Sequence, residues 1–423
     1  MTKILTNDWT EWLTLYQHLL VGFSGGLDST VLLHALNSVP ELSCKLIAVH
    51  VNHQLQPFAD DWQHQCFQLC QQWHIRFIAH KVAIPHQSNI EACAREARYG
   101  VFERLIGSED ALLTAHHADD QVETFFLNLF RGAGIAGMAC MPERQRFAKG
   151  MMLRPLLNHP KKTLEAYARH HQLQWIEDPS NDDSRYRRNW LRQEWLPQLE
   201  PHWPQAPTNI LRSIGLLQKS YQSEQSNALN LLEKCLEAAN RLAIKPLLQL
   251  SETEQKNVLR LWLKQHHIKM PTLLQLEQFF QSMIHAKKDA NPSWHFGDFV
   301  ARRYDGALYL LHQSQLQFPT KTVPWQRFPE PLVLPERCQQ LHATLLSELP
   351  SFRQAEIRFR QGGERLYWRG KTRVLKKLLQ DWSIPPWQRD SLPLLFIDGE
   401  LVAVADRAVC DQWQSVMLPL AIV

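Results

Sequence analysis

The sequence predicts an α/β fold: an N-terminal, Rossmann-like domain with a parallel sheet, then a helical domain and a small α+β domain. Short apolar segments alternate with helical stretches through the first half of the chain, as in parallel βαβ units. These segments are continuously apolar, which is typical of strands buried on both faces. A glycine-rich loop at residues 24–29 follows the first segment and precedes a helix, which predicts that the first domain binds a nucleotide.

The strands of the first domain are expected at residues 19–23, 46–51, 76–80, 111–115 and 151–156. The helices of this domain are expected at residues 30–36, 60–74, 90–106, 119–130 and 161–171. A further short strand is expected to begin at Trp175 and to run into a polar loop that reaches Asn181. These elements place the first domain at residues 1–215.

The pattern changes after residue 215. Leucines recur at helical spacing as far as residue 283, which predicts a helical domain over residues 216–314. Five prolines between residues 315 and 335 indicate a linker. The last domain, residues 336–423, combines strand signals with one helix and is expected to be a small α+β module. The strands expected after residue 215 lie at 294–296, 308–311, 357–359, 394–396 and 401–404, and the helix of the last domain lies at 372–382.

Composition excludes several classes of protein. An apolar content of 44% is enough for packed cores and too high for a disordered chain. No stretch reaches the ~18 uncharged apolar residues of a membrane span, and charged residues near the N-terminus argue against a secretory signal. We therefore expect a cytoplasmic protein without a membrane partner. The net charge of +4 is small, so a nucleic-acid interface would have to be local.

The eight cysteines are scattered along the chain without a CxxC pair. This spacing predicts reduced, structural thiols. It counts against a zinc ribbon and against an enzyme that relays a thiol.

The strongest signal of chemistry is the loop SGGLDS. Its glycines allow the backbone to turn tightly and to approach a ligand, and the helix that follows offers free N–H groups. Asp28 adds a carboxylate to an anion site, which favours a divalent cation there. The loop is neither a Walker A motif nor a GxGxxG fingerprint. A glycine turn with a capping aspartate is the alternative. The residues expected to bind phosphate are Ser24, Gly25, Gly26, Leu27, Asp28 and Ser29.

A second polar cluster lies where the fourth strand meets its helix. Because ligands bind at the carboxyl ends of parallel strands, this cluster and the glycine loop should face one crevice. Asp120 and Glu123 are three residues apart on one helix face, so they could hold a metal or a cationic amine. His116 precedes them. Helix capping is the alternative, and it leaves His116 and Glu123 unexplained.

Two weaker clusters contain arginines. Arg95 and Arg98 share a helix face with Glu91, and a solvated, salt-bridged face explains them equally well. The polar loop after Trp175 leads into an arginine group that includes Arg188, which suits contact with phosphate. A generic basic surface is the alternative for this group.

The last domain concentrates basic and aromatic side chains, a combination that is typical of RNA binding. Tyr367, Trp368, Trp382 and Trp387 are interleaved with the basic residues. A solvated basic face is the alternative. The residues expected to contact RNA are Arg369, Lys371, Arg373, Lys376 and Lys377.

The motif SGGxDS resembles the loop of the N-type ATP pyrophosphatases, the PP-loop superfamily. Several further stretches occur in the order and spacing of the bacterial tRNA(Ile)-lysidine synthetases and extend the resemblance over residues 15–200. The region from residue 370 to residue 396 is similar to the last domain of that family, whereas the helical middle is similar only in type. Residues 54–57 depart from the family pattern. The stretches are EACAREARY, TAHHADDQVET, RPLL, WIEDPSN and RRN.

The resemblance implies an ATP-dependent ligase. In that family, the wobble cytidine of a CAU-anticodon tRNA(Ile) is adenylated by ATP, pyrophosphate leaves, and L-lysine then displaces AMP to give lysidine. The loop would hold pyrophosphate, with Asp28 toward Mg²⁺, and His116 and Arg188 would steady the phosphates. Asp120 and Glu123 would position the lysine amine or accept its proton, and which of the two does so stays open.

The expected partners are therefore ATP, L-lysine and tRNA(Ile), with a homodimer as an open alternative to a monomer. Two rival functions remain. A tRNA thiolase of the same superfamily is disfavoured because no CxxC pair is present. An RNA-binding protein without catalysis is disfavoured because the loop and its carboxylates are intact.

Overall fold

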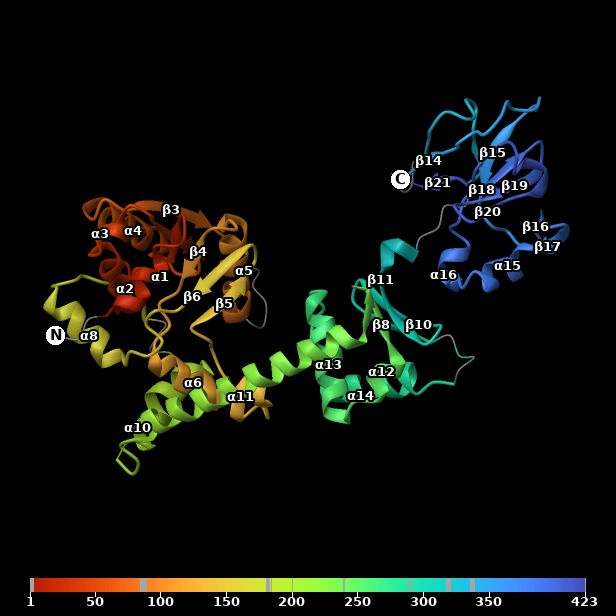
Figure 1. The fold of residues 1–423 in the computed structure, drawn as a ribbon. Helices are drawn as coiled ribbons and strands as arrows, with labels where there is room; N and C mark the ends of the chain where they lie inside the picture. The colour runs from red at the N-terminus through yellow and green to blue at the C-terminus, as the bar shows by residue number, and fades with distance from the viewer. Residues whose placement is uncertain are drawn as a thin grey trace. The chain divides into compact units, whose positions relative to one another are not determined.

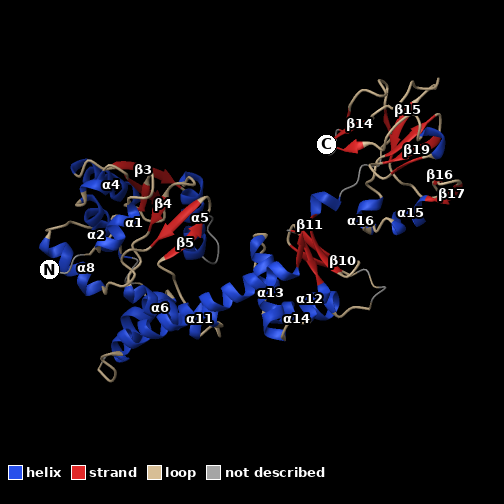
Figure 2. Cartoon of the chain, in the orientation of Figure 1, coloured by secondary structure: helices blue, strands red, loops and turns tan. Residues whose placement is uncertain are grey.

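The chain forms two compact units, Met1–Glu224 and Gln225–Val423. The computed structural model describes residues 4–83, 90–179, 183, 185–199, 201–238, 240–287, 290, 292–316, 321–334 and 339–422. Figure 1 colours the chain from the N-terminus to the C-terminus, and Figure 2 separates helices from strands.

The first unit contains a six-stranded sheet with the order β3-β2-β1-β4-β6-β5. The strands are β1 (Leu19–Gly22), β2 (Leu46–Asn52), β3 (Arg76–Lys81), β4 (Ala111–Leu113), β5 (Arg144–Phe147) and β6 (Gly150–Leu153). Neighbouring strands are parallel except for β5, which pairs antiparallel with β6. The α/β class is confirmed. The edge strand β5 escaped sequence analysis because half of its side chains are exposed and its hairpin turn carries no glycine before Gly150.

Helices cover both faces of this sheet, as its apolar strands require. Leu19 and Val21 of β1 pack with residues of α2, α4 and α8, whereas Leu20 packs with residues of α5 on the opposite face. The helices are α1 (Asn7–Leu13), α2 (Leu27–Asn37), α3 (Pro40–Ser43), α4 (Ala59–Gln72), α5 (Ile90–Leu105), α6 (Ala118–Leu129), α7 (Ile135–Met138) and α8 (Lys161–His170). The expected helices of this domain are thus confirmed within a few residues at their ends.

The strand expected at Trp175 is absent. Residues 173–178 have no regular secondary structure, and Ile176 N–H donates to the carbonyl oxygen of Gly25 at 2.9 Å. This segment therefore packs against the glycine loop instead of joining the sheet. The far end of the expected polar loop, Ser180 and Asn181, lies outside the described residues.

The rest of the first unit is helical. Its elements are α9 (Arg187–Trp190), a π-helical turn (Leu191–Trp195), α10 (Leu196–Leu199) and the first part of α11 (Ala206–Cys235). The amide of Gln218 on α11 donates to the carbonyl oxygens of Ala139 and Met141, both at 3.0 Å. These bonds attach α11 to the loop that follows α7.

The second unit begins with helices packed on an antiparallel sheet of order β7-β8-β11-β10-β9. Its strands are β7 (Leu236–Ala238), β8 (Arg241–Ala243), β9 (Ser293–Phe296), β10 (Phe299–Tyr304) and β11 (Ala307–His312). Its helices are α12 (Ile244–Leu248), α13 (Glu252–Gln265) and α14 (Leu273–Phe279), and the buried Trp262 lies in their core. The strands expected at 294–296 and 308–311 are confirmed, and the sheet is larger than the sequence indicated.

The end of the chain forms a second core from small antiparallel sheets. Their strands are β12 (Val323–Pro324), β13 (Leu332–Leu334), β14 (Gln339–His342), β15 (Ala355–Arg358), β16 (Arg365–Trp368), β17 (Lys371–Val374), β18 (Leu394–Ile397), β19 (Glu400–Val404), β20 (Ala408–Val409) and β21 (Ala421–Ile422), with helices α15 (Leu375–Asp381) and α16 (Pro386–Arg389). The helix expected to start at Thr372 begins at Leu375, because residues 371–374 pair with β16. Part of the expected linker also belongs to this core, where Trp325 is buried.

None of the helices in the described residues combines the length and the apolar composition that a membrane crossing requires. Within the same residues the thiols are unpaired, and Cys338 lies outside them. The free cysteines are Cys44, Cys66, Cys70, Cys93, Cys140, Cys235 and Cys410.

Candidate functional site

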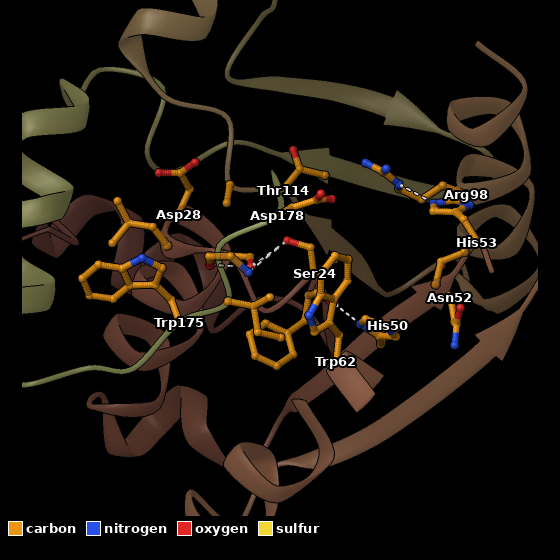
Figure 3. Close-up of a pocket in the computed structure, with 18 of the residues that line it drawn as sticks. Ser24, Asp28, His50, Asn52, His53, Trp62, Arg98, Thr114, Trp175 and Asp178 are labelled. Carbon is orange, nitrogen blue, oxygen red and sulfur yellow. Dashed lines mark hydrogen bonds between the residues drawn. The ribbon is translucent and has the colours of Figure 1, made fainter. Parts of the chain in front are cut away.

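A cavity of about 830 Å³ opens at the carboxyl ends of β1, β2 and β4. Strand order reverses between β1 and β4, and such a switch point is where open parallel sheets bind ligands. The loops after these strands, one face of α8 and the segment around Ile176 line the cavity. Figure 3 shows Asp28 and Trp175 toward one end of it and Arg98 and His53 toward the other. The expected site residues that line it are Ser24, Gly26, Leu27, Asp28, Ser29 and His116.

The glycine loop is held in a conformation that only glycine adopts easily. Gly25 has a φ of +84°, and a Cβ there would lie 2.6 Å from Cys66 Sγ and 2.7 Å from Ile176 Cδ1. Gly26 is the N-cap of α2, so the first N–H groups of that helix lack intrahelical partners and face the cavity end where the loop lies. The hydroxyls of Ser24 and Ser29 are 3.1 Å apart. The loop is therefore built to bind an anion through its backbone and hydroxyl groups.

Asp28 brings a carboxylate into this anion site. Its Oδ1 is buried without a hydrogen-bond partner, and burial raises the pKa of the carboxyl above its usual value. These features fit Mg²⁺, which takes one or two carboxylates together with phosphate oxygens and water. The described residues contain no cluster of three or more His, Cys, Asp or Glu that could enclose a metal, so phosphate and water would have to complete the coordination.

His117 connects the glycine loop with the second cluster, and sequence analysis missed it. Its Nε2 lies 3.6 Å from Asp28 Oδ2 and 3.6 Å from Asp120 Oδ2, and its Nδ1 lies 3.4 Å from Asp119 Oδ2. Burial alone would lower the pKa of this imidazole, but Asp119, Asp120 and Asp28 raise it above its usual value. In its protonated form this ring reduces the repulsion between the three carboxylates around it. The signal in the sequence that could have identified His117 was its position next to His116.

Glu123 is fully buried and paired with two guanidinium groups. Arg188 Nε donates to its Oε2 at 2.7 Å, and Arg192 Nε donates to its Oε1 at 2.6 Å. Arg192 Nη2 also lies 3.4 Å from Asp120 Oδ1. Sequence analysis identified Arg188 and missed Arg192, although four-residue spacing places both on one helix face.

The expected site residues of the second cluster lie at different depths. His116 lines the cavity, and Thr114 Oγ1 lies 2.9 Å from its Nδ1. Burial lowers the pKa of His116, so its ring stays neutral. Asp120 and Glu123, with 13% and 1% of their side chains exposed, lie behind this lining. Arg192 lines the cavity in front of them.

The end of the cavity at β2 contains histidines and arginines. His50 Nδ1 lies 3.0 Å from the carbonyl oxygen of Phe23. Arg98 Nε donates to His53 Nε2 at 3.4 Å, and Figure 3 shows this pair at one end of the cavity. Burial, then Arg98, lowers the pKa of His53 to about 4, so the ring is a neutral acceptor. Arg98 of α5 therefore lines the cavity and pairs with His53, which a purely solvated, salt-bridged helix face does not explain.

Comparisons with known proteins extend over almost the whole chain. Family models for a PP-loop domain, a TilS substrate binding domain and a TilS substrate C-terminal domain match residues 2–199, 242–309 and 355–416. The tRNA(Ile)-lysidine synthase of Legionella pneumophila (strain Paris) is 42% identical over 97% of this chain and 96% of that protein. The chain belongs to the tRNA(Ile)-lysidine synthase family.

More distant relatives of the tRNA(Ile)-lysidine synthase family give the same assignment. The enzyme of that name from Coxiella burnetii is 37% identical over 95% of this chain and 92% of its own length. The one from Salmonella typhimurium is 39% identical over 92% of this chain and 92% of its own length.

Among solved structures, the U34-tRNA thiolase NcsA from Methanococcus maripaludis is 20% identical over 51% of this chain and 77% of its own, with a TM-score of 0.41.

The region matched by the TilS C-terminal family model contains the basic and aromatic hairpin β16–β17. Trp368 stacks under two guanidinium groups, those of Arg369 at 4.3 Å and Arg373 at 5.5 Å from its ring centre. Asp411 accepts from the backbone N–H groups of Arg369 and Gly370 and so fixes the turn. The exposed basic residues of this surface are Arg369, Lys371, Lys376 and Lys377, whereas Arg373 is half-buried.

Proposed function

We propose that this chain joins L-lysine to C2 of the wobble cytidine in a tRNA(Ile) with a CAU anticodon, which gives lysidine. The PP-loop domain uses ATP, and in this reaction ATP yields AMP and pyrophosphate through an adenylated cytidine. The observation that carries the proposal is the near full-length match to curated tRNA(Ile)-lysidine synthases. The cavity at the carboxyl ends of β1, β2 and β4 supports it, because an anion-binding loop and a cluster of titratable groups meet there.

The first step adenylates the cytidine. The C2 carbonyl oxygen attacks the α-phosphate of ATP, and pyrophosphate leaves toward the glycine loop. Ser24, Gly26 and Ser29, together with the first N–H groups of α2, are proposed to hold the departing charge. The adenylated oxygen is a much better leaving group than the original carbonyl oxygen.

Mg²⁺ is proposed to bind at Asp28. When bound there, the ion would neutralise charge on the phosphates and so favour the departure of pyrophosphate. The buried Oδ1 of Asp28 without a partner supports this assignment. The neutral ring of His116 and the guanidinium of Arg188 are proposed to steady the phosphates.

The second step transfers lysine. Its ε-amine attacks C2, and AMP leaves. Asp120 and Glu123 remain the proposed carboxylates for the amine or its proton. Because Glu123 already accepts from two guanidinium groups, we assign it to position Arg188 and Arg192 and assign the amine to Asp120.

The tRNA is proposed to contact the basic surface of the last domain as well as the cavity. Basic side chains can follow the phosphates of the acceptor side, and aromatic rings can stack on bases. The contacting residues would be Arg369, Lys371, Arg373, Lys376 and Lys377. A tRNA substrate also favours a cytoplasmic place of action, and light scattering of the pure protein would distinguish a monomer from a homodimer.

The thiolase alternative has less support. The seven described cysteines are all free, and burial raises the thiol pKa of five of them, to about 12 for Cys66 and Cys70 and to about 11 for Cys140, with Cys235 and Cys410 also raised. Thiols with raised pKa are poor nucleophiles at neutral pH. A protein that only binds RNA would not require a phosphate cradle beside buried carboxylates.

Labelled lysine provides the test. The full chain is incubated with ATP, Mg²⁺ and tRNA(Ile) that has a CAU anticodon, and label in the tRNA is measured together with AMP release. Asp28→Asn should fold normally and form neither product. Incorporation of sulfur instead of lysine, or binding of tRNA without release of AMP, would contradict the proposal.

A further inference from the structure

The β2 end of the cavity concentrates positive charge that no described carboxylate neutralises. Arg98 lines this end with Arg95, and no described acidic side chain forms an ion pair with either of them. Arg95 donates to the hydroxyl of Tyr99 at 3.1 Å and lies over its ring. Desolvation, and then the neighbouring Arg95, lower the pKa of the Arg98 guanidinium. The side chain is exposed at the cavity wall, so an anion that enters the cavity can reach it and offset the repulsion between the two guanidinium groups.

His53 completes the polar surface at this end. Its Nε2 accepts from Arg98 Nε, which leaves the two terminal nitrogens of the guanidinium available to a ligand. Its own Nδ1 is buried without a hydrogen-bond partner. The planar guanidinium, held in place by His53, can pair with the two oxygens of a carboxylate or of a phosphodiester.

The charges of the cavity suit a ligand with opposite charges at its two ends. His116 lies within electrostatic reach of Asp120 and of Arg95, because the first raises and the second lowers its pKa. Asp120 lies behind this ring, whereas Arg95 and Arg98 line the cavity itself. The phosphates of ATP have their own cradle at the other end, near Asp28 and Trp175 (Figure 3).

We propose that Arg98 and His53 form an oxyanion subsite that is distinct from the phosphate cradle and takes a carboxylate or phosphodiester of the second or third substrate. The α-carboxylate of lysine is one source, with the ε-amine directed toward Asp120. A phosphodiester next to the wobble cytidine is the other source. This inference rests on the proposed function, since both sources are substrates of that reaction.

The two sources are separated by a substrate analogue. Cadaverine retains the amine that reacts and lacks the α-carboxylate, so lysine and cadaverine differ at this subsite alone. The apparent affinities of lysine, cadaverine, ATP and tRNA are measured in the full chain and in Arg98→Gln, Arg98→Lys and His53→Gln. Arg104→Gln is the matched control, because Arg104 lies on the same helix and is exposed.

Loss of a charge-assisted bond predicts a weakening of about 10- to 100-fold. If the subsite holds the carboxylate, Arg98→Gln raises KM for lysine by that factor and removes the preference over cadaverine. If it holds a phosphodiester, the variant raises KM for tRNA, reduces the salt slope of tRNA binding by about one contact, and leaves that preference unchanged. Arg98→Lys should fall between Arg98→Gln and the wild type in either case.

Two results would overturn the inference. In the first, all affinities of the Arg98 and His53 variants equal those of the Arg104→Gln control. In the second, only KM for ATP changes, which would assign Arg98 to the nucleotide. Thermal melting shows whether Arg98→Gln folds. If it does not fold, the same affinities are compared in Arg98→Lys and His53→Gln. Failure of the wild type to incorporate lysine is a different outcome, because it contradicts the proposed function itself.

Discussion

Glu123 and Arg192 share two hydrogen bonds, from Arg192 Nε to Oε1 at 2.6 Å and from Nη2 to Oε2 at 3.1 Å. The carboxylate is almost fully buried, whereas a third of the Arg192 side chain is exposed and reaches the cavity. Arg188 completes the arrangement from the same helical segment. Glu123 thus fixes the position of a guanidinium that substrates can contact.

The first prediction concerns the two half-reactions. In Glu123→Gln the amide has one acceptor oxygen and no charge, so it cannot hold both guanidinium groups. We expect unfolding to become easier by about 1–3 kcal/mol and both half-reactions to slow by about 10- to 100-fold, because Arg188 is proposed to steady the phosphates and Arg192 lies beside Asp120. Glu96→Gln, an exposed change on α5, is the control. Loss of lysine transfer alone, with ATP–pyrophosphate exchange as in the wild type, would show that Glu123 acts on the lysine amine and not through Arg188.

The second prediction concerns the glycine loop. In Gly25→Ala, the left-handed backbone at this position strains the alanine by about 1–3 kcal/mol. The new Cβ also comes into close contact with Cys66 and Ile176. Gly132→Ala is a matched control, because Gly132 also has a positive φ of +68° and open space around it. Denaturant titration should show a larger loss of stability for Gly25→Ala, and calorimetry should show a loss of ATP binding for that variant alone. Equal losses in both variants would mean that the close contacts are relieved at no cost.

Sequence analysis predicted the features that are encoded locally. Continuous apolar runs identified β1, β2 and β4, and the positions of the glycine loop and of His116 followed from the rule that ligands bind where parallel strands end. The edge strand β5 was missed, since short and partly exposed strands have weak patterns. The prediction of a strand at Trp175 was wrong because of a tertiary contact. The N–H of Ile176 donates to the carbonyl oxygen of Gly25 in the glycine loop, and this segment does not pair with a strand.

The interior of the candidate site depended on contacts between distant segments. His117 is an unremarkable second histidine in the sequence, and only the fold surrounds it with Asp28, Asp119 and Asp120. Arg192 comes from a helical turn nearly seventy residues after Glu123. Such pairings are set by packing, which a single sequence does not display.

The third prediction uses the pKa of His53. Its value of about 4 in the folded chain lies below the ~6.5 of an unfolded histidine. As pH falls below about 6.5, the unfolded chain binds the proton first, so the free energy of unfolding decreases. His53→Gln should reduce this decrease by about 1 kcal/mol between pH 7 and pH 4, a value discounted because the ring is only partly buried. The measurement is denaturant unfolding against pH.

An exposed histidine is the control for this experiment. His64→Gln removes a ring that lies at the surface of α4 and should leave the pH dependence as it is in the wild type. The interpretation of His53 as a buried neutral acceptor fails if both variants and the wild type give superimposable curves.

The last prediction concerns the hairpin β16–β17. Arg369 and Lys371 are exposed beside its turn, and Arg373 is stacked on Trp368. Changing Arg369, Lys371 and Arg373 together to Gln should weaken tRNA binding and flatten its salt dependence, because each lost phosphate contact removes about 0.7–0.9 from the slope. Loss of the two cation–π contacts costs about 0.5–1 kcal/mol each, which thermal melting would reveal. ATP binding should not change, because the phosphate cradle lies in the first unit.

A charge-matched triple variant separates a specific surface from the effect of net charge. Lys321, Arg327 and Arg407 are exposed residues of the second unit outside the hairpin, and their change to Gln removes the same charge. If the hairpin binds tRNA, only the hairpin variant shows both the lower affinity and the flatter slope when affinity is measured at several salt concentrations. Equal effects of the two triple variants would mean that tRNA responds to net charge alone. Affinity and slope equal to those of the wild type in both would mean that the hairpin is a solvated face and that tRNA binds elsewhere.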